Sequence, residues 1–432
     1  WLSSVYGYNY YLDQFHLADR LLLWLLWGVV LWHPAGLGPL VWWALVMQGQ
    51  FQYPLGSYSL TDIRPLYEQL LLLQIYLAAH AILAWLPAKL PWLARWQPVL
   101  PPIWALALCL QAANYLVPGW GKLRMGWLSH DGLADFWLAA YSYGWMASLG
   151  DERALALAAW LTRFNLPLLL LTLLVELGVI LILWRRRLTL ALLLAMAGLH
   201  VAILAFSGIF FWKWITLDLL LFYIIRRQDA GETRQLYARP VVGAAFLLLL
   251  SSGFLFRPTP LYWYDTPLTQ RFNLELVTTT GEVMPLDRNF MRPFQIVFSK
   301  EGMHILNTEP FLVGTYGAVS ELAVQEALLA ARSPADVRAI GAELGQIVVS
   351  EVGRRQYDAF MRTYFSNYNH ERRFAGWIWP NHILVETPAG AYDGSAPVAQ
   401  VRVRYIQTWY DGQQLHVIGD EIIHVTDIPA AD

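Results

Sequence analysis

The sequence predicts a polytopic α-helical membrane domain of about seven transmembrane helices, followed by an extracytoplasmic α+β domain. Of the 432 residues, 57% are hydrophobic and only 14% are charged, whereas about a quarter of the residues of a typical soluble domain are charged. The apolar residues gather in long runs within residues 1–257, such as LPLLLLTLLVELGVILILW at 166–184. Residues 258–432 instead have the composition of a soluble domain of ordinary size.

Seven apolar segments are candidates for transmembrane helices, each of which needs about 20 residues to cross a bilayer. They are residues 20–48, 66–86, 97–117, 163–184, 188–206, 209–226 and 240–256. The first segment is too long for one straight span, and HPAGLGP at 33–39 interrupts it. It is therefore either a kinked helix or a tight hairpin of two helices.

Basic residues near the ends of these segments predict their orientation, because Lys and Arg concentrate in cytoplasmic loops. With seven spans, four basic groups fall on one side: Arg20, Lys89 with Arg95, Arg185–Arg187, and Arg226–Arg227. This arrangement places the N-terminus in the cytoplasm, and the loop 118–162 and the C-terminal domain outside it. If the first segment is a hairpin, only the N-terminus changes side. We expect the chain to lie in the inner membrane of a bacterium.

The C-terminal domain is predicted to combine strands with a helix. FNLELVTTTGEVMPL from residue 272 and PFQIVFSKEGMHIL from residue 293 are typical of strands around turns. VRVRYIQTWYDGQQLHVIG at 401–419 predicts a hairpin, because Asp411-Gly412 is a turn signal between two strand-like runs. Ser333, followed by Pro334 and by an acid at Asp336, predicts the start of a helix that runs to about Ser366.

Composition excludes several classes of function. The net charge is −2, and the Arg-rich pieces are too short and scattered for a nucleic-acid surface. The single cysteine, Cys109, excludes an internal disulfide and a cysteine metal cluster. The sequence has no Gly-rich phosphate loop after a strand, no HExxH and no GxSxG motif. We therefore expect no nucleic-acid partner and no metal, and the partner that composition does indicate is the lipid bilayer.

A few ionisable residues fall inside or beside the predicted spans, where a charge is costly and usually faces a cavity or a partner. They are His80, Lys122, Glu176, His200, Lys213 and Asp218. Each also has an ordinary structural explanation. The histidines could be satisfied within the core, and Glu176 could bond to a neighbouring helix. Asp218 could pair with Lys213, and Lys213 and Arg124 could reach the lipid headgroups.

The order of motifs around these residues resembles that of the vitamin K-dependent γ-carboxylase-like family, also called the HTTM family. NYLVPGWGKLRMGW carries Tyr115, then Gly119-x-x-Lys122-Leu123, then Trp127. Further along the chain, VELG carries Glu176, and GLHVAILAFSGIFFWKW carries His200 ahead of an aromatic cluster. The resemblance covers about residues 15–230 and does not extend to the C-terminal domain.

The resemblance implies a site for reduced vitamin K or menaquinol. In the family's carboxylases, a lysine at the position of Lys122 deprotonates the quinol. Oxygen then converts the quinol to an epoxide, and the strong base so formed removes a γ-proton from a peptide glutamate, to which carbon dioxide adds. We predict seven site residues: Lys122, His200 and Glu176 as catalytic, and Tyr115, Trp120, Trp127 and Asp218 as cofactor-binding. The two tryptophans are predicted from their placement, and Asp218 from its position inside a span. A lysine with a pKa of about 10.4 is protonated at neutral pH, and an apolar pocket at the bilayer edge lowers that pKa.

The sequence departs from the carboxylase pattern in two ways, so other functions stay open. The carboxylases have a His before an earlier span, where this chain reads TDIRP at 61–65, and Arg is a poor proton acceptor. The C-terminal domain is also much smaller than a carboxylase's. The first alternative is a non-catalytic membrane subunit that docks a peptide or protein through its extracytoplasmic domain, with Lys122 paired to a carboxylate or a headgroup. The second is a transporter, or an immunity or maturation factor for an exported peptide.

Overall fold

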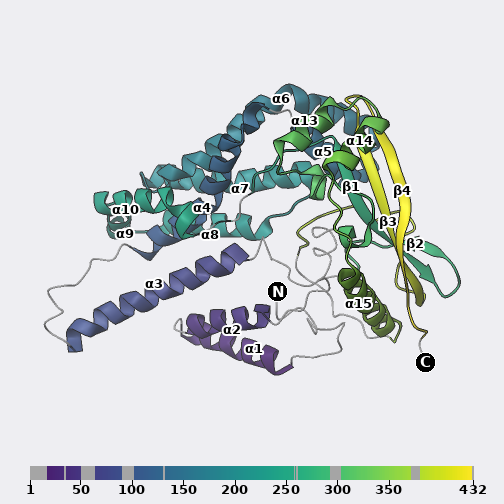
Figure 1. Cartoon of the computed structure of the whole chain (residues 1–432). Helices are drawn as coiled ribbons and strands as arrows, with labels where there is room; N and C mark the ends of the chain where they lie inside the picture. The colour runs from purple at the N-terminus through teal and green to yellow at the C-terminus, as the bar shows by residue number, and fades with distance from the viewer. Residues whose placement is uncertain are drawn as a thin grey trace.

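The computed structural model describes residues 17–33, 36–49, 64–89, 102–129, 132–256, 258, 261–291, 303–370 and 380–430. Within these ranges, a group of helices extends to Leu255, and a four-stranded antiparallel sheet with further helices begins at Leu268. Figure 1 shows the helical group and the sheet at opposite ends of the molecule. The chain is mostly helical over the described residues.

Eleven α-helices precede the sheet in the described part of the chain. They are α1 Leu17–Trp32, α2 Leu37–Gly49, α3 Arg64–Lys89, α4 Ile103–Arg124, α5 Leu133–Ser142, α6 Asp151–Gly178, α7 Arg186–Ser207, α8 Trp212–Arg227, α9 Ala230–Leu236, α10 Arg239–Leu250 and α11 Ser252–Leu255. The central helix is α4, which contacts α3, α6 and α10, while α7 packs along α8. Figure 1 shows α1 and α2 lying apart from this central group.

The prediction of about seven transmembrane helices is wrong. Among the described residues, only two helical stretches are long and apolar enough to cross a bilayer, Asp151–Leu181 and Arg186–Ser207. The predicted first span is two helices of 16 and 13 residues. Helices α8 and α10 have only 16 and 12 residues, fewer than the approximately 20 that a bilayer requires.

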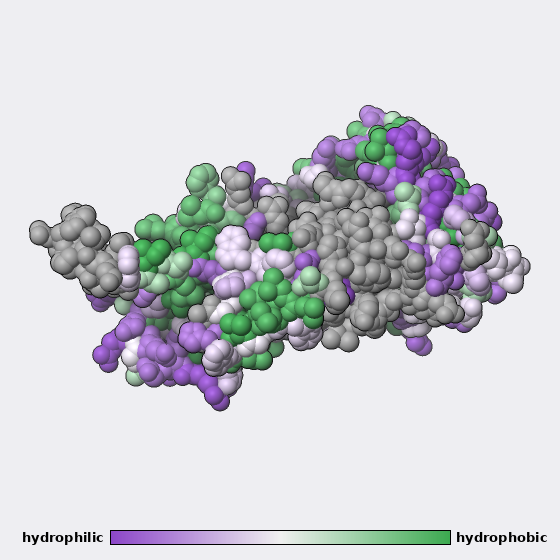
Figure 2. Space-filling view, turned by 90° about the horizontal axis from the view of Figure 1, so that it is seen from below, coloured by the Kyte–Doolittle hydropathy of each residue, from purple (hydrophilic) through white to green (hydrophobic). Residues whose placement is uncertain are grey.

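The hydropathy pattern overestimated the spans because it cannot distinguish a helix surrounded by protein from one surrounded by lipid. Helix α4 is 22 residues long, but it carries Gln111, Asn114 and Lys122, and much of its surface is buried against other helices. The two candidate spans differ from α4, because only 28% of each apolar stretch is buried inside the protein. In Figure 2, hydrophobic residues cover much of the helical part, and hydrophilic residues dominate the end that carries the sheet.

The first predicted segment is divided into two helices that contact each other, which is the hairpin alternative. Helix α1 ends at Trp32 and α2 begins at Leu37, within the stretch that was expected to interrupt the segment. The indole Nε1 of Trp43 in α2 donates to the backbone oxygen of Asp19 in α1 at 2.9 Å. In the TDIRP segment, residues 61–63 lie outside the described residues, and Arg64 begins α3.

Four strands form one antiparallel sheet in the order β2-β1-β3-β4. They are β1 Leu268–Thr278, β2 Val283–Pro285, β3 Val398–Tyr410 and β4 Leu415–Asp427. The hairpin predicted at 401–419 is present as β3 and β4, with Gly412 at φ 95° in the turn. Such a positive φ suits glycine because it has no Cβ. The first predicted strand pair is present as β1 and β2.

Two other predictions for this region are wrong. Instead of one helix from Ser333 to about Ser366, the structure has α14 Pro334–Leu344 and α15 Glu351–Asn369, after α13 Leu322–Ala330. The break occurs because Gln346 forms a β-bridge with Phe311, and a second cap, Ser350, starts α15. Of PFQIVFSKEGMHIL, residues 293–302 lie outside the described residues, and Met303–Leu306 form a 3-10 turn instead of a strand.

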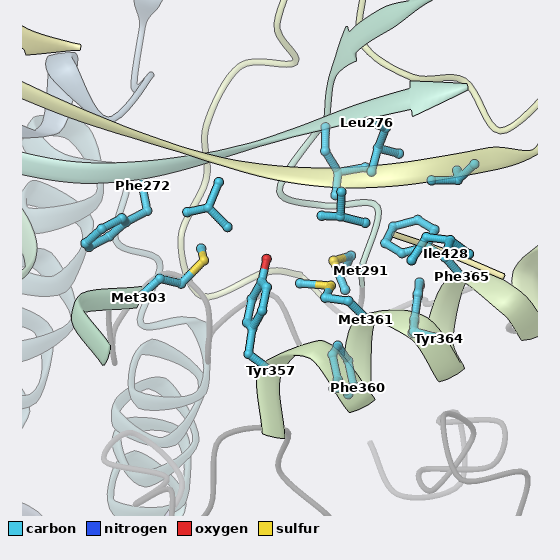
Figure 3. Packing of buried hydrophobic residues seen from close by; sticks show 14 of the residues in the cluster. Phe272, Leu276, Met291, Met303, Tyr357, Phe360, Met361, Tyr364, Phe365 and Ile428 are labelled. Atoms are coloured by element: carbon cyan, nitrogen blue, oxygen red, sulfur yellow. The ribbon is translucent and has the colours of Figure 1, made fainter. Parts of the chain in front are cut away.

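The core of the sheet region lies between the sheet and α15. Figure 3 shows Phe272 and Leu276 of β1 facing Tyr357, Met361 and other large side chains of the helix. Leu276 is fully buried in this cluster. Because this core holds the sheet against its helix, it fixes the position of β1, whose edge lies against the helical group.

We expect Leu276→Ala to lower the free energy of unfolding of the sheet region by about 2–5 kcal/mol, since it leaves a cavity in a closed core. Leu344→Ala is the matched control, because Leu344 is 38% exposed and lies outside the core clusters, and its change should stay within about 0.5 kcal/mol. Denaturant unfolding followed by tyrosine and tryptophan fluorescence measures both. Equal effects of the two substitutions would contradict this account of the core.

Candidate functional site

Residues far apart in the sequence form a buried polar network at the centre of the helical group. The Lys122 Nζ of α4 lies 2.5 Å from Oε1 of Glu176 in α6. The Tyr115 hydroxyl of α4 donates to Oδ2 of Asp218 in α8 at 2.7 Å, and it lies 3.0 Å from Nδ1 of His200 in α7. Four helices therefore contribute ionisable groups to one region.

Helix α4 positions its part of the network through residue spacing. Gln111, Tyr115 and Lys122 are four and seven residues apart, which places them along one face of the helix. Gly119 lets α6 approach this face, because a Cβ at residue 119 would lie only 2.7 Å from the Cβ of Glu176. The glycine of the Gly119-x-x-Lys122 motif thus makes room for the carboxylate that pairs with the lysine.

Asp218 is a fully buried carboxylate, with no exposed surface. Its Oδ1 accepts from Nε2 of Gln111 at 2.6 Å, and its Oδ2 accepts from Tyr115. These bonds offset part of the cost of burying the charge. Nδ1 of His200 lies 3.8 Å from Oδ2 of Asp218. Asp218 is therefore satisfied by Gln111 and Tyr115, and does not pair with Lys213.

The hydrogen bonds determine which ring nitrogen of His200 carries a proton. A tyrosine hydroxyl has a single hydrogen, and that of Tyr115 points to Asp218. The tyrosine oxygen must then accept from His200, so Nδ1 of His200 carries a hydrogen. Glu176 is close enough to His200 and Tyr115 to interact with both electrostatically. The two halves of the network are therefore coupled.

Two buried oxygens of the network have no hydrogen-bond partner among the described residues, Oε2 of Glu176 and Oε1 of Gln111. Both are acceptors, and a buried acceptor without a donor is costly. A ligand with hydroxyl groups, such as a quinol, would supply the missing donor to Glu176. This oxygen of Glu176 is the feature of the network that is compatible with a quinol. Among the described residues, no group of three His, Cys, Asp or Glu side chains could hold a metal ion.

The two tryptophans predicted for the site differ in their distance from it. Trp127 is beside the site, with its ring centroid 5.0 Å from Nζ of Lys122, a cation–π distance. Trp120 is 56% exposed and lies outside the network. The structure thus brings together six of the seven predicted residues, and leaves Trp120 apart. Their catalytic and cofactor-binding roles stay predictions.

Asp265, which was not predicted from the sequence, lies between the helical group and the sheet. Its carboxylate is buried and accepts from the indole Nε1 of Trp263 at 2.9 Å. Burial raises the pKa of Asp265 to about 7, although the Trp263 hydrogen bond and the Lys122 charge both act to lower the pKa. The carboxylate thus changes charge near neutral pH. The sequence feature that could have indicated this residue is an acid at the end of the aromatic run YWYD, directly after the helical group.

The same aromatic run fixes the end of α4. A Cβ at Gly121 would lie 2.0 Å from the ring of Tyr262, so this ring packs directly on the glycine next to Lys122. The Tyr264 hydroxyl donates to the backbone oxygen of Met125 at 2.9 Å. Tyr264 also forms a β-bridge with Val319 in the sheet region. One short segment therefore contacts both the helical site and the sheet region.

Comparisons of the chain with protein-family models, curated proteins and solved structures found no match. The resemblance to the γ-carboxylase-like family therefore rests on the motif residues alone.

We expect Gly119→Ala to lower the free energy of unfolding by about 1–3 kcal/mol, because the new methyl group would collide with Glu176 and force α4 and α6 apart. Gly198→Ala in α7 is the control. A Cβ there meets nothing within 4 Å, so alanine should stabilise the helix by about 0.5–1 kcal/mol. Chemical denaturation in detergent measures both changes. If Gly119→Ala also stabilised the protein, the close approach of α4 and α6 would be wrong.

The raised pKa of Asp265 predicts a pH dependence of stability. Between the ordinary pKa of 3.8 and the folded-state pKa of about 7, the folded protein holds a proton that the unfolded chain has released. The contribution of this group to stability therefore falls as pH rises through this window, by up to about 4 kcal/mol. Above pH 7 it stays at its low value.

Asp265→Asn keeps the acceptor for Trp263 and removes this titration. We expect the variant to match the unaltered protein near pH 4 and to exceed its stability at pH 8. Thermal unfolding midpoints across this pH range test the difference. Two parallel pH profiles would show that Asp265 does not titrate with a raised pKa.

Proposed function

We propose that this chain is a membrane enzyme that performs acid–base chemistry on a quinol, with the Lys122–Glu176 pair as its proton acceptor. The observation that carries the proposal is the convergence of Lys122, Glu176, Tyr115, His200 and Asp218 in one buried network. Buried ionisable clusters cost stability and mark functional sites more often than ordinary core positions. The unpartnered Oε2 of Glu176 adds an acceptor that the fold itself does not use.

The pair can accept a proton without first losing one. In its ion-paired form, Lys122 is an ammonium and cannot act as a base alone. The Glu176 carboxylate can take a proton at Oε2 while Oε1 stays bonded to Lys122. The ammonium then remains beside the negative charge that develops on the deprotonated substrate, which stabilises that charge in a poorly solvated site. The base role implied for Lys122 is thus shared with Glu176.

Tyr115, His200 and Asp218 would relay the proton away from the pair. His200 already carries a hydrogen on Nδ1, and the Tyr115 hydroxyl lies between His200 and Asp218. When bound, a quinol would supply an acidic hydroxyl and two electrons, and oxygen, the oxidant that the resemblance implies, would accept the electrons. Trp127 lies beside Lys122 and would limit the access of water to the pair.

We propose that α6 and α7 anchor the chain in a bilayer, in a bacterium the inner membrane. Their apolar stretches are largely uncovered by the protein, and Arg185–Arg187 lie where α7 begins, at the turn after α6. A basic loop favours the cytoplasmic side, so the sheet region that follows would be extracytoplasmic. The predicted cytoplasmic N-terminus depended on seven spans, and we do not propose it.

A non-catalytic subunit is the second candidate, and one observation favours it. Lys122 is paired with a carboxylate, as that alternative predicted. In this case the network would only hold the helices together, and the sheet region would dock a peptide or protein partner.

Substitutions at the pair distinguish these two functions. Lys122→Met alone leaves the buried Glu176 charge unpaired, so we would also make Lys122→Met/Glu176→Gln, which removes both charges. If the chain is a quinol enzyme, both variants should lower the rate of menaquinol oxidation in proteoliposomes by at least about 100-fold, the usual range for loss of an acid–base group. Lys213→Met, which removes a lysine outside the network, is the control.

The readout is the absorbance change on quinol oxidation, with the thermal midpoint of each variant as a check of folding. Unchanged oxidation by the folded double variant would contradict the proposed function. If the unaltered protein neither binds nor oxidises menaquinol, the chain is better explained as a non-catalytic subunit.

A further inference from the structure

A second site lies at the edge of the sheet, outside the buried network. A cavity of about 450 Å³ is bounded by residues 143–147 after α5, by residues 271–274 of β1, and by the segments 285–291 and 385–389. Strand β2 pairs only with Glu275, Leu276 and Val277, and the backbone N of Leu286 donates to the oxygen of Leu274 at 2.8 Å, so the edge of β1 is open at residues 271–273. The cavity therefore lies where the helical group meets an unpaired strand edge.

Two arginines line this cavity, Arg271 of β1 and Arg288. Nε of Arg271 and Nη1 of Arg288 are buried and have no hydrogen-bond partner among the residues that the structure describes. Burial, with a smaller contribution from the charge of Arg288, lowers the pKa of Arg271 to about 10. Both guanidinium groups stay charged at neutral pH. Two like charges thus lie together with unused donors.

Two carboxylates, Asp287 and Glu386, also line this cavity, and both are engaged by other partners. Glu386 accepts from the backbone N and the hydroxyl of Ser148, both at 2.8 Å. Asp287 accepts from the backbone N of Asn289 at 2.8 Å and from the Thr387 hydroxyl at 2.7 Å.

Asp420 interacts with Arg271 only through its charge, since its Oδ1 accepts from Nε of Arg404 at 2.6 Å. The Tyr143 ring, 4.9 Å from the guanidinium carbon of Arg288, offers one arginine a cation–π contact. This contact supplies no hydrogen-bond acceptor for Nη1 of Arg288 or Nε of Arg271.

The rest of the cavity wall is largely apolar. Phe272, Leu274, Leu286, Met291 and Met303 contribute to it. Figure 3 shows Phe272 and Met303 together at one end of the core cluster. An inorganic ion would leave these side chains in contact with water, whereas an organic anion with an apolar body would cover them. Small-molecule sites usually combine such an apolar wall with a few placed polar groups.

We propose that this cavity binds a small organic anion, with its carboxylate or phosphate between Arg271 and Arg288 and its apolar body against Phe272 and the methionines. Guanidinium groups bind both kinds of oxyanion through paired N–H···O bonds. The anion offsets the repulsion between the two arginines that line the cavity. None of the residues of this cavity belongs to the Lys122 network, so either proposal can be wrong without affecting the other.

Calorimetric titration of the full chain in a neutral detergent tests this site. The probes are 3-phenylpropionate, phenyl phosphate and the uncharged 3-phenylpropanol. We expect at least one of the two anions to bind at least tenfold more tightly than the alcohol, and to bind more weakly as chloride rises. The anion that binds more tightly identifies the head group. Equal affinities for the anions and the alcohol, or no binding of any probe, would overturn the proposal.

Substitutions locate the binding. Arg288→Gln and Arg271→Gln should each weaken anion binding at least tenfold and leave binding of the alcohol unchanged. Arg338→Gln, at an exposed position of α14, is the matched control and should change neither. Arg288→Lys keeps the positive charge but lacks the planar guanidinium that forms two parallel hydrogen bonds. We expect it to weaken anion binding less than Arg288→Gln does. This variant also tests the site if the glutamine variants do not fold. Anion binding that is unchanged in the folded Arg288 variants would place the ligand elsewhere and refute the assignment.

Discussion

The arrangement of the helical group depends on the burial of charge along α4. This helix holds the Asp218 carboxylate through Gln111 and Tyr115, and it holds Glu176 through Lys122. Removing one partner of a buried ion pair costs several kcal/mol, because the other charge stays without compensation. Helices α6 and α8 therefore cannot shift independently of α4. The apolar contacts around this network also stabilise the helical group. They depend less on exact distances between atoms than the ion pair and hydrogen bonds do.

Sequence motifs were sufficient to find most of the candidate site. Tyr115 and Lys122 are seven residues apart on one helix, so their placement on a common face follows from helical geometry. Glu176, His200 and Asp218 were recognised because ionisable residues are rare in apolar helices. Their partners could not be predicted. That Lys122 pairs with Glu176, while Tyr115 lies between His200 and Asp218, depends on how four helices pack.

The predictions that were wrong depended on tertiary surroundings. An apolar helix such as α4 can be covered by other helices as well as by lipid, and hydropathy is the same in both cases. The continuous helix expected after Ser333 is broken because Gln346 pairs with Phe311, a residue 35 positions earlier in the chain. Asp265 was missed because its significance comes from burial against the helical group, not from a motif. The hairpin of β3 and β4 was predictable because its turn signal and its strands are adjacent in the sequence.

The segment from Tyr262 to Asp265 has a mechanical consequence. The Tyr262 ring packs on Gly121, the Tyr264 hydroxyl is bonded to Met125, and the backbone of Tyr264 pairs with Val319. These contacts attach the sheet region to the end of α4 on both sides of Lys122. The sheet region therefore cannot rotate as a free unit on a flexible tether. A force applied to it, for example by a partner that pulls on the sheet, is transmitted along a path of a few residues to the lysine.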